Sequence, residues 1–170
     1  LLVETIHNEV PTLNKNNIKL HVIGDIDMLP DAAKAELKDA LNETAGNTGL
    51  HLIMALSYSS RWEITEAVKQ IANEVKEGNL QPASITQKTV ENYLATKDFP
   101  DPELMIRTSG EYRVSNFLLY QIAYAELYFT NTLWPDFRKE NLYAAILDFQ
   151  SRERRFGKTG EQVKDREATG

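Results

Sequence analysis

The stretch LHLIMALSY, residues 50–58, decides the fold class of this chain. It is apolar almost throughout, and His51 is the exception near its start. A short continuous apolar run of this kind is typical of a strand that is buried on both faces of a parallel sheet. We therefore predict such a strand here, within a sheet that helices cover.

The segments on either side alternate between strand-like and helix-like patterns. Further strands are predicted at residues 18–23, 104–107 and 127–129. Helices are predicted at residues 1–13, 30–44, 60–78, 86–94, 115–124 and 139–149. This alternation predicts one α/β domain with a mainly parallel sheet over residues 1–157, followed by a polar, mobile tail over residues 158–170.

The helix predicted after residue 60 carries two more detailed expectations. Ser60 with Glu63 has the spacing of a capping box, which would begin the helix. Four aliphatic side chains at near-helical spacing should face inward: Ile64, Val68, Ile71 and Val75.

The amino-acid composition excludes several classes of function and of binding site. The chain has 170 residues, of which 19 are basic and 25 acidic, for a net charge of −6. An acidic chain is a poor general binder of nucleic acid, so an anionic ligand needs a local cluster of Arg or Lys. The absence of cysteine excludes disulfides and zinc–thiolate sites and fits the cytosol. No apolar run approaches the ~18 to 20 residues of a membrane helix.

One loop carries the strongest signal for chemistry: RTSGEYRVSN, residues 107–116, between a predicted strand and a predicted helix. Arg107 and Arg113 can grip phosphate oxygens through paired donors. Ser115 is expected at the helix N-terminus, where free N–H groups favour an anion. The loop is a plausible diphosphate cradle, although the same residues are also common as surface ion pairs and helix caps.

Two carboxylates, Glu111 and Glu126, fall in the same region of the sequence. Mg²⁺ takes oxygen ligands from one or two carboxylates together with substrate phosphates. Glu126 lies in an apolar segment, where an unpaired carboxylate would be costly, so it needs either a protein partner or a metal. The pattern does not choose between the two.

The C-terminal run RERRFG, residues 152–157, is by its charge a solvated helix end. Neither a Walker loop nor a dinucleotide-binding glycine motif occurs in the sequence, and the three histidines have no metal-ligand spacing.

Taken in order, these segments resemble the bacterial undecaprenyl diphosphate synthases, a family of cis-prenyltransferases. The resemblance runs from residue 1 to about residue 157. Its segments are IGD at 23–25, TAGNTG at 44–49, SRWE at 60–63, RTSGE at 107–111, RVSNFLL at 113–119, QIAYAELYF at 121–129, LWPDF at 133–137 and RERRFG at 152–157.

The resemblance implies an enzyme that condenses isopentenyl diphosphate onto an allylic diphosphate, usually farnesyl diphosphate, with cis double bonds and the help of Mg²⁺. It implies that Arg107, Arg113 and Ser115 bind the isopentenyl diphosphate and that Glu126 is associated with the metal. It also implies a cytoplasmic homodimer, possible peripheral contact with the membrane for product release, and Arg155 and Gly157 reaching the neighbour's diphosphate.

The family fold has a mostly parallel central sheet and helices that form an apolar tunnel for the growing chain. Leu50, Leu52 and Met54 would lie on the tunnel floor, with the opening helix as one wall. An ordinary core position fits these three residues equally well.

The chain departs from the family pattern at several positions. Tyr112 stands where many members carry His, so we assign it no role. Ser59 and Ser60 replace a Gly-Gly, and Glu63 replaces an Asp. The family's catalytic Asp, in a Gly-Asn-Gly-Arg-Trp segment, has no counterpart in residues 1–170, which open with Leu1 inside a helical pattern. We therefore expect an upstream segment to supply it, and the 170-residue chain to be inactive alone.

Two alternatives remain. The first is a non-catalytic partner subunit of a prenyltransferase complex, against which the Arg107, Arg113 and Ser115 set argues. The second is a cis-prenyltransferase with a shorter product, which the bulk of the tunnel would decide.

Overall fold

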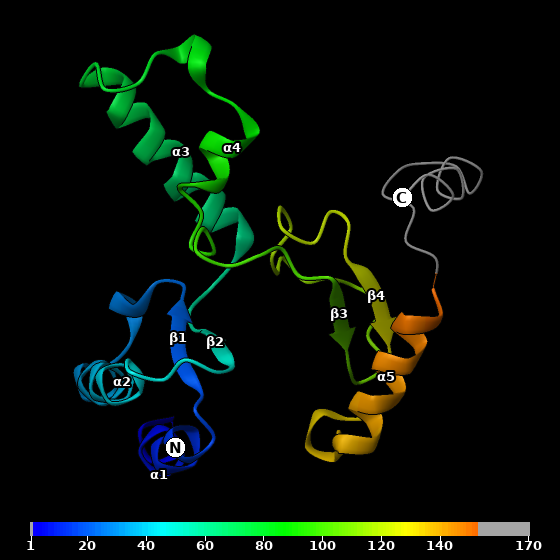
Figure 1. Ribbon diagram of the computed structural model, residues 1–170. Helices are drawn as coiled ribbons and strands as arrows, with labels where there is room; N and C mark the ends of the chain where they lie inside the picture. Colours follow the sequence, from blue (N-terminus) through cyan, green and yellow to red (C-terminus); the bar gives the residue numbers. More distant parts are fainter. Residues whose placement is uncertain (1, 153–170) are drawn as a thin grey trace. The chain divides into compact units, whose positions relative to one another are not determined.

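The computed structural model describes residues 2–152 (Figure 1), and the chain divides into two compact units, Leu1–Pro100 and Asp101–Gly170. The first unit contains the helices and strands α1 (Leu2–Lys15), β1 (Lys19–Ile23), η1 (Ile26–Met28), α2 (Asp31–Thr44), β2 (His51–Ala55), α3 (Ser60–Lys76), η2 (Pro82–Ser84) and α4 (Gln87–Glu91). The second contains β3 (Leu104–Arg107), β4 (Glu126–Phe129), η3 (Trp134–Asp136) and α5 (Lys139–Ser151).

The core of the first unit forms where α1, α2 and β1 meet. Helix α1 contributes its buried stripe at helical spacing, Ile6, Val10 and Leu13. Against this stripe pack Leu37 of α2 and Leu20 of β1, which are only 2% and 3% exposed. The amphipathic opening helix predicted from the sequence is thereby confirmed.

Strands β1 and β2 pair in parallel, with Leu20 beside Leu52 and Val22 beside Met54. The TAGNTG segment secures the start of this pair. The buried Thr44 hydroxyl donates to the Ala40 carbonyl at 2.9 Å and accepts from the Leu20 N–H at 3.2 Å. The Asn47 amide donates to the Ile18 carbonyl at 2.7 Å. These bonds hold the turn after α2 against the beginning of β1.

Gly24 ends β1 at a position that no other residue fits without strain. Its φ is +111°, in a region that side-chain-bearing residues rarely adopt. An added Cβ would also lie 2.0 Å from the backbone oxygen of Leu56. The Ile23-Gly24-Asp25 segment is therefore dictated by the close approach of two backbones.

The strand predicted at residues 50–58 is present, but it is shorter, and its burial on both faces is wrong. No residue of β2 is fully buried, and the Leu52 side chain is 40% exposed. The reason is that β2 belongs to a ladder of two strands, in which the helices α1 and α2 gather around β1.

The capping box predicted from Ser60 and Glu63 is also wrong. Ser59 is the N-cap of α3, and its hydroxyl accepts a hydrogen bond from the Trp62 N–H at 3.3 Å. Of the four residues predicted to face inward, Ile71 is buried, but Val68 is 56% exposed. The residues buried along α3 are Ser60, Glu63, Ala67 and Ile71. A polar residue, Glu63, takes a core position, which a hydrophobicity pattern does not reveal.

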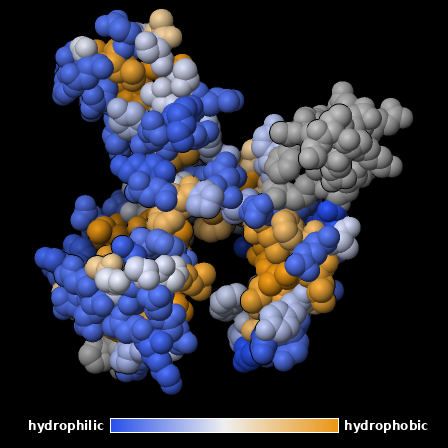
Figure 2. Space-filling model, in the orientation of Figure 1, coloured by the Kyte–Doolittle hydropathy of each residue, from blue (hydrophilic) through white to orange (hydrophobic). Residues whose placement is uncertain are grey.

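In the second unit, β3 and β4 pair in parallel from Leu104 beside Glu126 to Arg107 beside Phe129. Helix α5 packs against β4 through its buried Ala145 and leaves apolar side chains exposed, which Figure 2 shows gathered along the helix. The α/β class with parallel strands is thus confirmed in both units. Among the described residues, no helix is long and apolar enough to cross a membrane.

The helix predicted at residues 115–124 is wrong. Ser115, Asn116 and Leu118 have φ angles of 55°, 60° and 48°, in the left-handed region. Consecutive helical hydrogen bonds cannot form through such residues, so the segment runs as a series of bends and turns before β4. Its apolar spacing alone did not distinguish turns from a helix.

Candidate functional site

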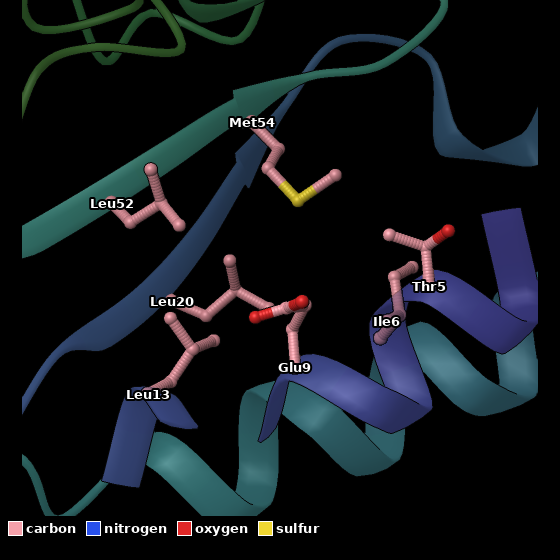
Figure 3. Close-up of a pocket in the computed structure, with 7 residues that line it drawn as sticks. All are labelled: Thr5, Ile6, Glu9, Leu13, Leu20, Leu52 and Met54. Carbon is pink, nitrogen blue, oxygen red and sulfur yellow. The ribbon is translucent and has the colours of Figure 1, made fainter. Parts of the chain in front are cut away.

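An apolar pocket of about 170 Å³ lies in the first unit between α1 and the two strands β1 and β2. Figure 3 shows its lining residues, which are Thr5, Ile6, Glu9, Leu13, Leu20, Leu52 and Met54. The parallel register places Leu20 beside Leu52, so both strands present leucines to the same space. A pocket lined in this way can hold a hydrocarbon group.

Two of the three predicted tunnel residues line this pocket. Leu52 and Met54 contribute side chains from β2, and helix α1 forms a wall, as the close-up shows (Figure 3). Leu50 precedes β2, is 66% exposed and does not line the pocket. Glu9 also faces this largely apolar pocket with its carboxylate. The sequence did not indicate this, because the helical position of Glu9 resembles that of any surface residue.

In the second unit, Arg107 ends β3, and the loop that follows is fixed by backbone bonds to the segment after β4. The N–H groups of Ser109 and Gly110 donate to the carbonyls of Thr132 and Thr130, each at 2.9 Å. Gly110 has a φ of +65°, and a Cβ there would come within 3.0 Å of the Asn131 side chain. The glycine therefore permits a tight turn in which a side chain would crowd Asn131.

Arg107 has an unused hydrogen-bond donor. Its Nε atom is buried and has no hydrogen-bond partner among the residues that the structure describes. Buried donors normally have a partner, so this atom calls for a ligand or a rearrangement. A phosphate oxygen is one acceptor that would satisfy it.

Arg113 lies further along the same loop and forms an ion pair with Glu111. Its side chain is 67% exposed, so the pair is weak and can open to receive an anion. Ser115 is exposed and is not at a helix N-terminus, since the segment after it is not helical. Any contact between Ser115 and an anion must therefore come from its hydroxyl or its own backbone, without the dipole of a helix.

Glu126 is the first residue of β4 and lies at the opposite end of the ladder from Arg107. Three residues of strand separate these two positions, which is roughly 10 Å. Its Oε2 atom accepts a hydrogen bond from Arg152 Nη1 at 3.0 Å. The sequence left open whether Glu126 pairs with a protein group or with a metal. The structure shows a protein partner, Arg152.

The family resemblance implies a magnesium ion. No group of three or more His, Asp or Glu residues that could hold a metal occurs among the side chains that the structure describes. A single carboxylate holds Mg²⁺ only together with other oxygen ligands such as substrate phosphates. Because Glu126 is paired with Arg152, the described residues do not form a metal site by themselves.

Glu63 is a buried carboxylate whose partners the sequence did not reveal. It is 3% exposed, and its two oxygens accept from the Tyr58 hydroxyl at 2.6 Å and from the Ala95 N–H at 2.9 Å. These bonds join the loop before α3 to the turn after α4. Both oxygens of Glu63 therefore accept hydrogen bonds from within the first unit.

Arg155 and Gly157, the remaining residues of the predicted substrate site, lie outside the described residues, as does the predicted tail over residues 158–170.

Comparison with known proteins gives a consistent result. A family model described as putative undecaprenyl diphosphate synthase matches residues 1–157. The chain is 51% identical to an isoprenyl transferase of Chlorobaculum tepidum, over 98% of this chain and 63% of that protein. It is 46% identical to a farnesyl-diphosphate-specific ditrans,polycis-undecaprenyl-diphosphate synthase of Pseudomonas syringae, over 96% of this chain and 65% of that protein.

Among solved structures, the chain resembles lavandulyl diphosphate synthase from Lavandula x intermedia, crystallised with dimethylallyl diphosphate. The TM-score is 0.90 at 36% identity, covering 92% of this chain and 68% of the plant protein. The chain thus spans just under two thirds of the length of the two bacterial relatives.

Proposed function

Because the chain belongs to the undecaprenyl diphosphate synthase family of prenyltransferases, we propose that the whole protein condenses isopentenyl diphosphate onto farnesyl diphosphate. The new double bonds are cis, and the product is undecaprenyl diphosphate, the precursor of the lipid carrier for cell-wall synthesis. The name of the Pseudomonas syringae relative supports farnesyl diphosphate as the allylic substrate.

The apolar pocket of the first unit carries this proposal. Prenyl chains are pure hydrocarbon, and they are driven from water into apolar surroundings. Leu13, Leu20 and Leu52 offer such surroundings between a helix and two strands. In the proposed enzyme, Leu52 and Met54 line the path of the growing chain, and Leu50 lies near its end.

The diphosphate of isopentenyl diphosphate is assigned to the loop after β3. Arg107 offers a buried Nε donor, and Arg113 offers an exposed guanidinium that pairs with Glu111. Hydrogen bonds from arginine to phosphate are charge-assisted and strong. Ser115, Arg155 and Gly157 complete the proposed site, the last two from the neighbouring subunit.

The proposal includes a symmetric homodimer formed by residues 127–156. Trp134 is 72% exposed and stacks on Phe137 at a ring distance of 6.1 Å, and the exposed apolar side chains of α5 extend the same region of sequence. Aromatic residues are enriched in interface cores. Light scattering on the full-length protein should show a dimer at micromolar concentration, and a monomer would contradict this part of the proposal.

The enzyme is proposed to work in the cytoplasm, in peripheral contact with the membrane when it releases product; the chain contains no cysteine, which fits that compartment. A need for Mg²⁺ is also proposed, with Glu126 as its associated residue. Glu126 is bonded to Arg152 through its Oε2 atom, and the metal contact is assigned to its other oxygen, Oε1. Removal of metal with EDTA should abolish transfer, and added Mg²⁺ should restore it.

A shorter product is the second candidate, because the lavandulyl diphosphate synthase structure matches this chain with a TM-score of 0.90. One experiment separates the two. The full-length protein is incubated with labelled isopentenyl diphosphate, farnesyl diphosphate and Mg²⁺, and products are resolved by length. Undecaprenyl diphosphate is expected; short products favour the second candidate, and no incorporation overturns both.

A further inference from the structure

Three charged side chains meet where α5 ends and β4 begins. Asp148 lies in the last turn of α5, Arg152 immediately follows the helix, and Glu126 opens β4. The bond between Arg152 and Glu126 spans 26 positions in the sequence, so no local pattern indicated it.

The two terminal nitrogens of Arg152 have different tasks. Nη1 donates to Glu126 Oε2 and to the Leu127 carbonyl oxygen, both at 3.0 Å. Nη2 forms an ion pair with Asp148 Oδ2 at 2.5 Å. Asp148 lies one helical turn before Arg152, so it orients the guanidinium from within α5, while the other nitrogen holds the carboxylate of β4.

Partial burial strengthens the ion pair between Arg152 and Glu126. The Arg152 and Glu126 side chains are 31% and 28% exposed, so water screens them less than a fully exposed pair. The hydrogen bond to Glu126 is the largest cause that raises the pKa of Arg152 above its ordinary value. Arginine suits this position because its planar fork can bond Glu126 and Asp148 at the same time, which a lysine cannot do with fixed geometry.

We propose that Arg152 is a positioning residue for the prenyl transfer reaction, which holds the Glu126 carboxylate in place and is itself oriented by Asp148. This inference rests on the proposed function, in which Glu126 takes part. Arg152 acts through Glu126, and the grip on the diphosphate by Arg107 and Arg113 does not depend on it.

The test measures transfer kinetics in the full-length protein. Arg152→Gln should lower kcat about 10- to 100-fold, since a carboxylate displaced by an ångström can cost that much. The KM for isopentenyl diphosphate should change little. Arg152→Lys should recover part of the loss because it keeps the charge. Lys69→Gln on α3 also removes a positive charge from an ion pair, the surface pair with Glu66, and as the control it should leave kcat unchanged.

Two further variants distinguish a role of Arg152 in positioning Glu126 from a purely structural role of the ion pair. Asp148→Asn keeps Arg152 but removes its orienting partner, and it should lower kcat in the same direction even if Arg152→Gln fails to fold. The double exchange Glu126→Arg with Arg152→Glu should return thermal stability towards the wild-type value without returning turnover.

The outcomes are distinct. A wild-type protein without transfer activity overturns the proposed function, and the positioning role with it. An active wild type whose kcat is unaffected by both Arg152→Gln and Asp148→Asn overturns only the role of Arg152. Recovery of turnover together with stability in the double exchange shows that the pair is a structural brace, and it also overturns the role.

Discussion

The two units hold their candidate site residues in different ways. In the first unit, Leu13 and Leu20 line the pocket and also belong to the hydrophobic core, so the pocket is a continuation of the core. In the second, Arg107 and Arg113 lie at a strand end and in a loop fixed by backbone hydrogen bonds. We infer that stability and ligand binding are coupled in the first unit and separable in the second.

The largest effect is expected for Leu20→Ala. Leu20 is 3% exposed and lies in the pocket and in the core. Removal of its side chain should cost about 2–5 kcal/mol of unfolding free energy and enlarge the pocket. Chemical denaturation measures the loss; Val68→Ala, at a position 56% exposed on α3, should stay within about 0.5 kcal/mol. Equal losses of unfolding free energy in the two variants would contradict the inference that the pocket is a continuation of the core.

Arg113→Ala tests whether ligand binding in the second unit is separable from stability. If Arg113 grips a diphosphate, its loss removes a charge-assisted bond worth roughly 1.5–3 kcal/mol. The KM for isopentenyl diphosphate should then rise about 10- to 100-fold, with unfolding free energy unchanged within about 0.5 kcal/mol. Steady-state kinetics and a melting curve on the full-length protein check both. An unaltered KM refutes the site, whereas a collapsed melting temperature assigns Arg113 to a structural ion pair.

Glu63→Gln sharpens the comparison, because Glu63 is a polar residue buried in the first unit. Its two oxygens both accept hydrogen bonds, and the amide group of Gln would turn one acceptor into a donor. The Tyr58 hydroxyl can accept from that amide, but the bonds are then no longer charge-assisted, and the exchange should cost about 1 kcal/mol of unfolding free energy. The matched control is Glu66→Gln on the same helix, which loses only a pair with Lys69 at the surface. A loss no greater than that of the control would show that the Glu63 bonds are dispensable.

The smallest effect concerns pH. His21 Nε2 and His51 Nδ1 lie 2.8 Å apart, and Phe99 packs edge-on against both rings. Burial, followed by His51 and Lys19, lowers the pKa of His21 from its ordinary value of 6.5, and Asp98 opposes the shift.

The folded chain therefore binds a proton at His21 less readily than the unfolded chain does. This contribution to stability is present above the ordinary value of 6.5 and is lost as the pH falls below it, through the lower pKa of the folded state. The melting temperature should accordingly rise between about pH 5.5 and pH 7.5, and His21→Asn should reduce the rise. A slope that the substitution leaves unchanged would contradict this assignment.

Much of the fold could be predicted because its signals are local. The amphipathic stripe of α1, the strand at residues 104–107 and the last helix each follow from spacing within a few turns or pleats. The predictions that were wrong share a cause. The segment after Ser115 and the face of α3 have apolar residues at helical spacing, but neighbours distant in the sequence decide which of them are buried.

By itself, the sequence determined the α/β class, the order of most elements and the family, through motifs that fall in one order along residues 1–157. Only the tertiary structure decided that Glu126 pairs with Arg152, that Glu63 bonds to the Ala95 N–H, and that Ser115 has a left-handed backbone. The physical reason is that a charge or a buried polar atom takes the partner that folding brings within about 3 Å, and here that partner lies 26 to 32 positions away.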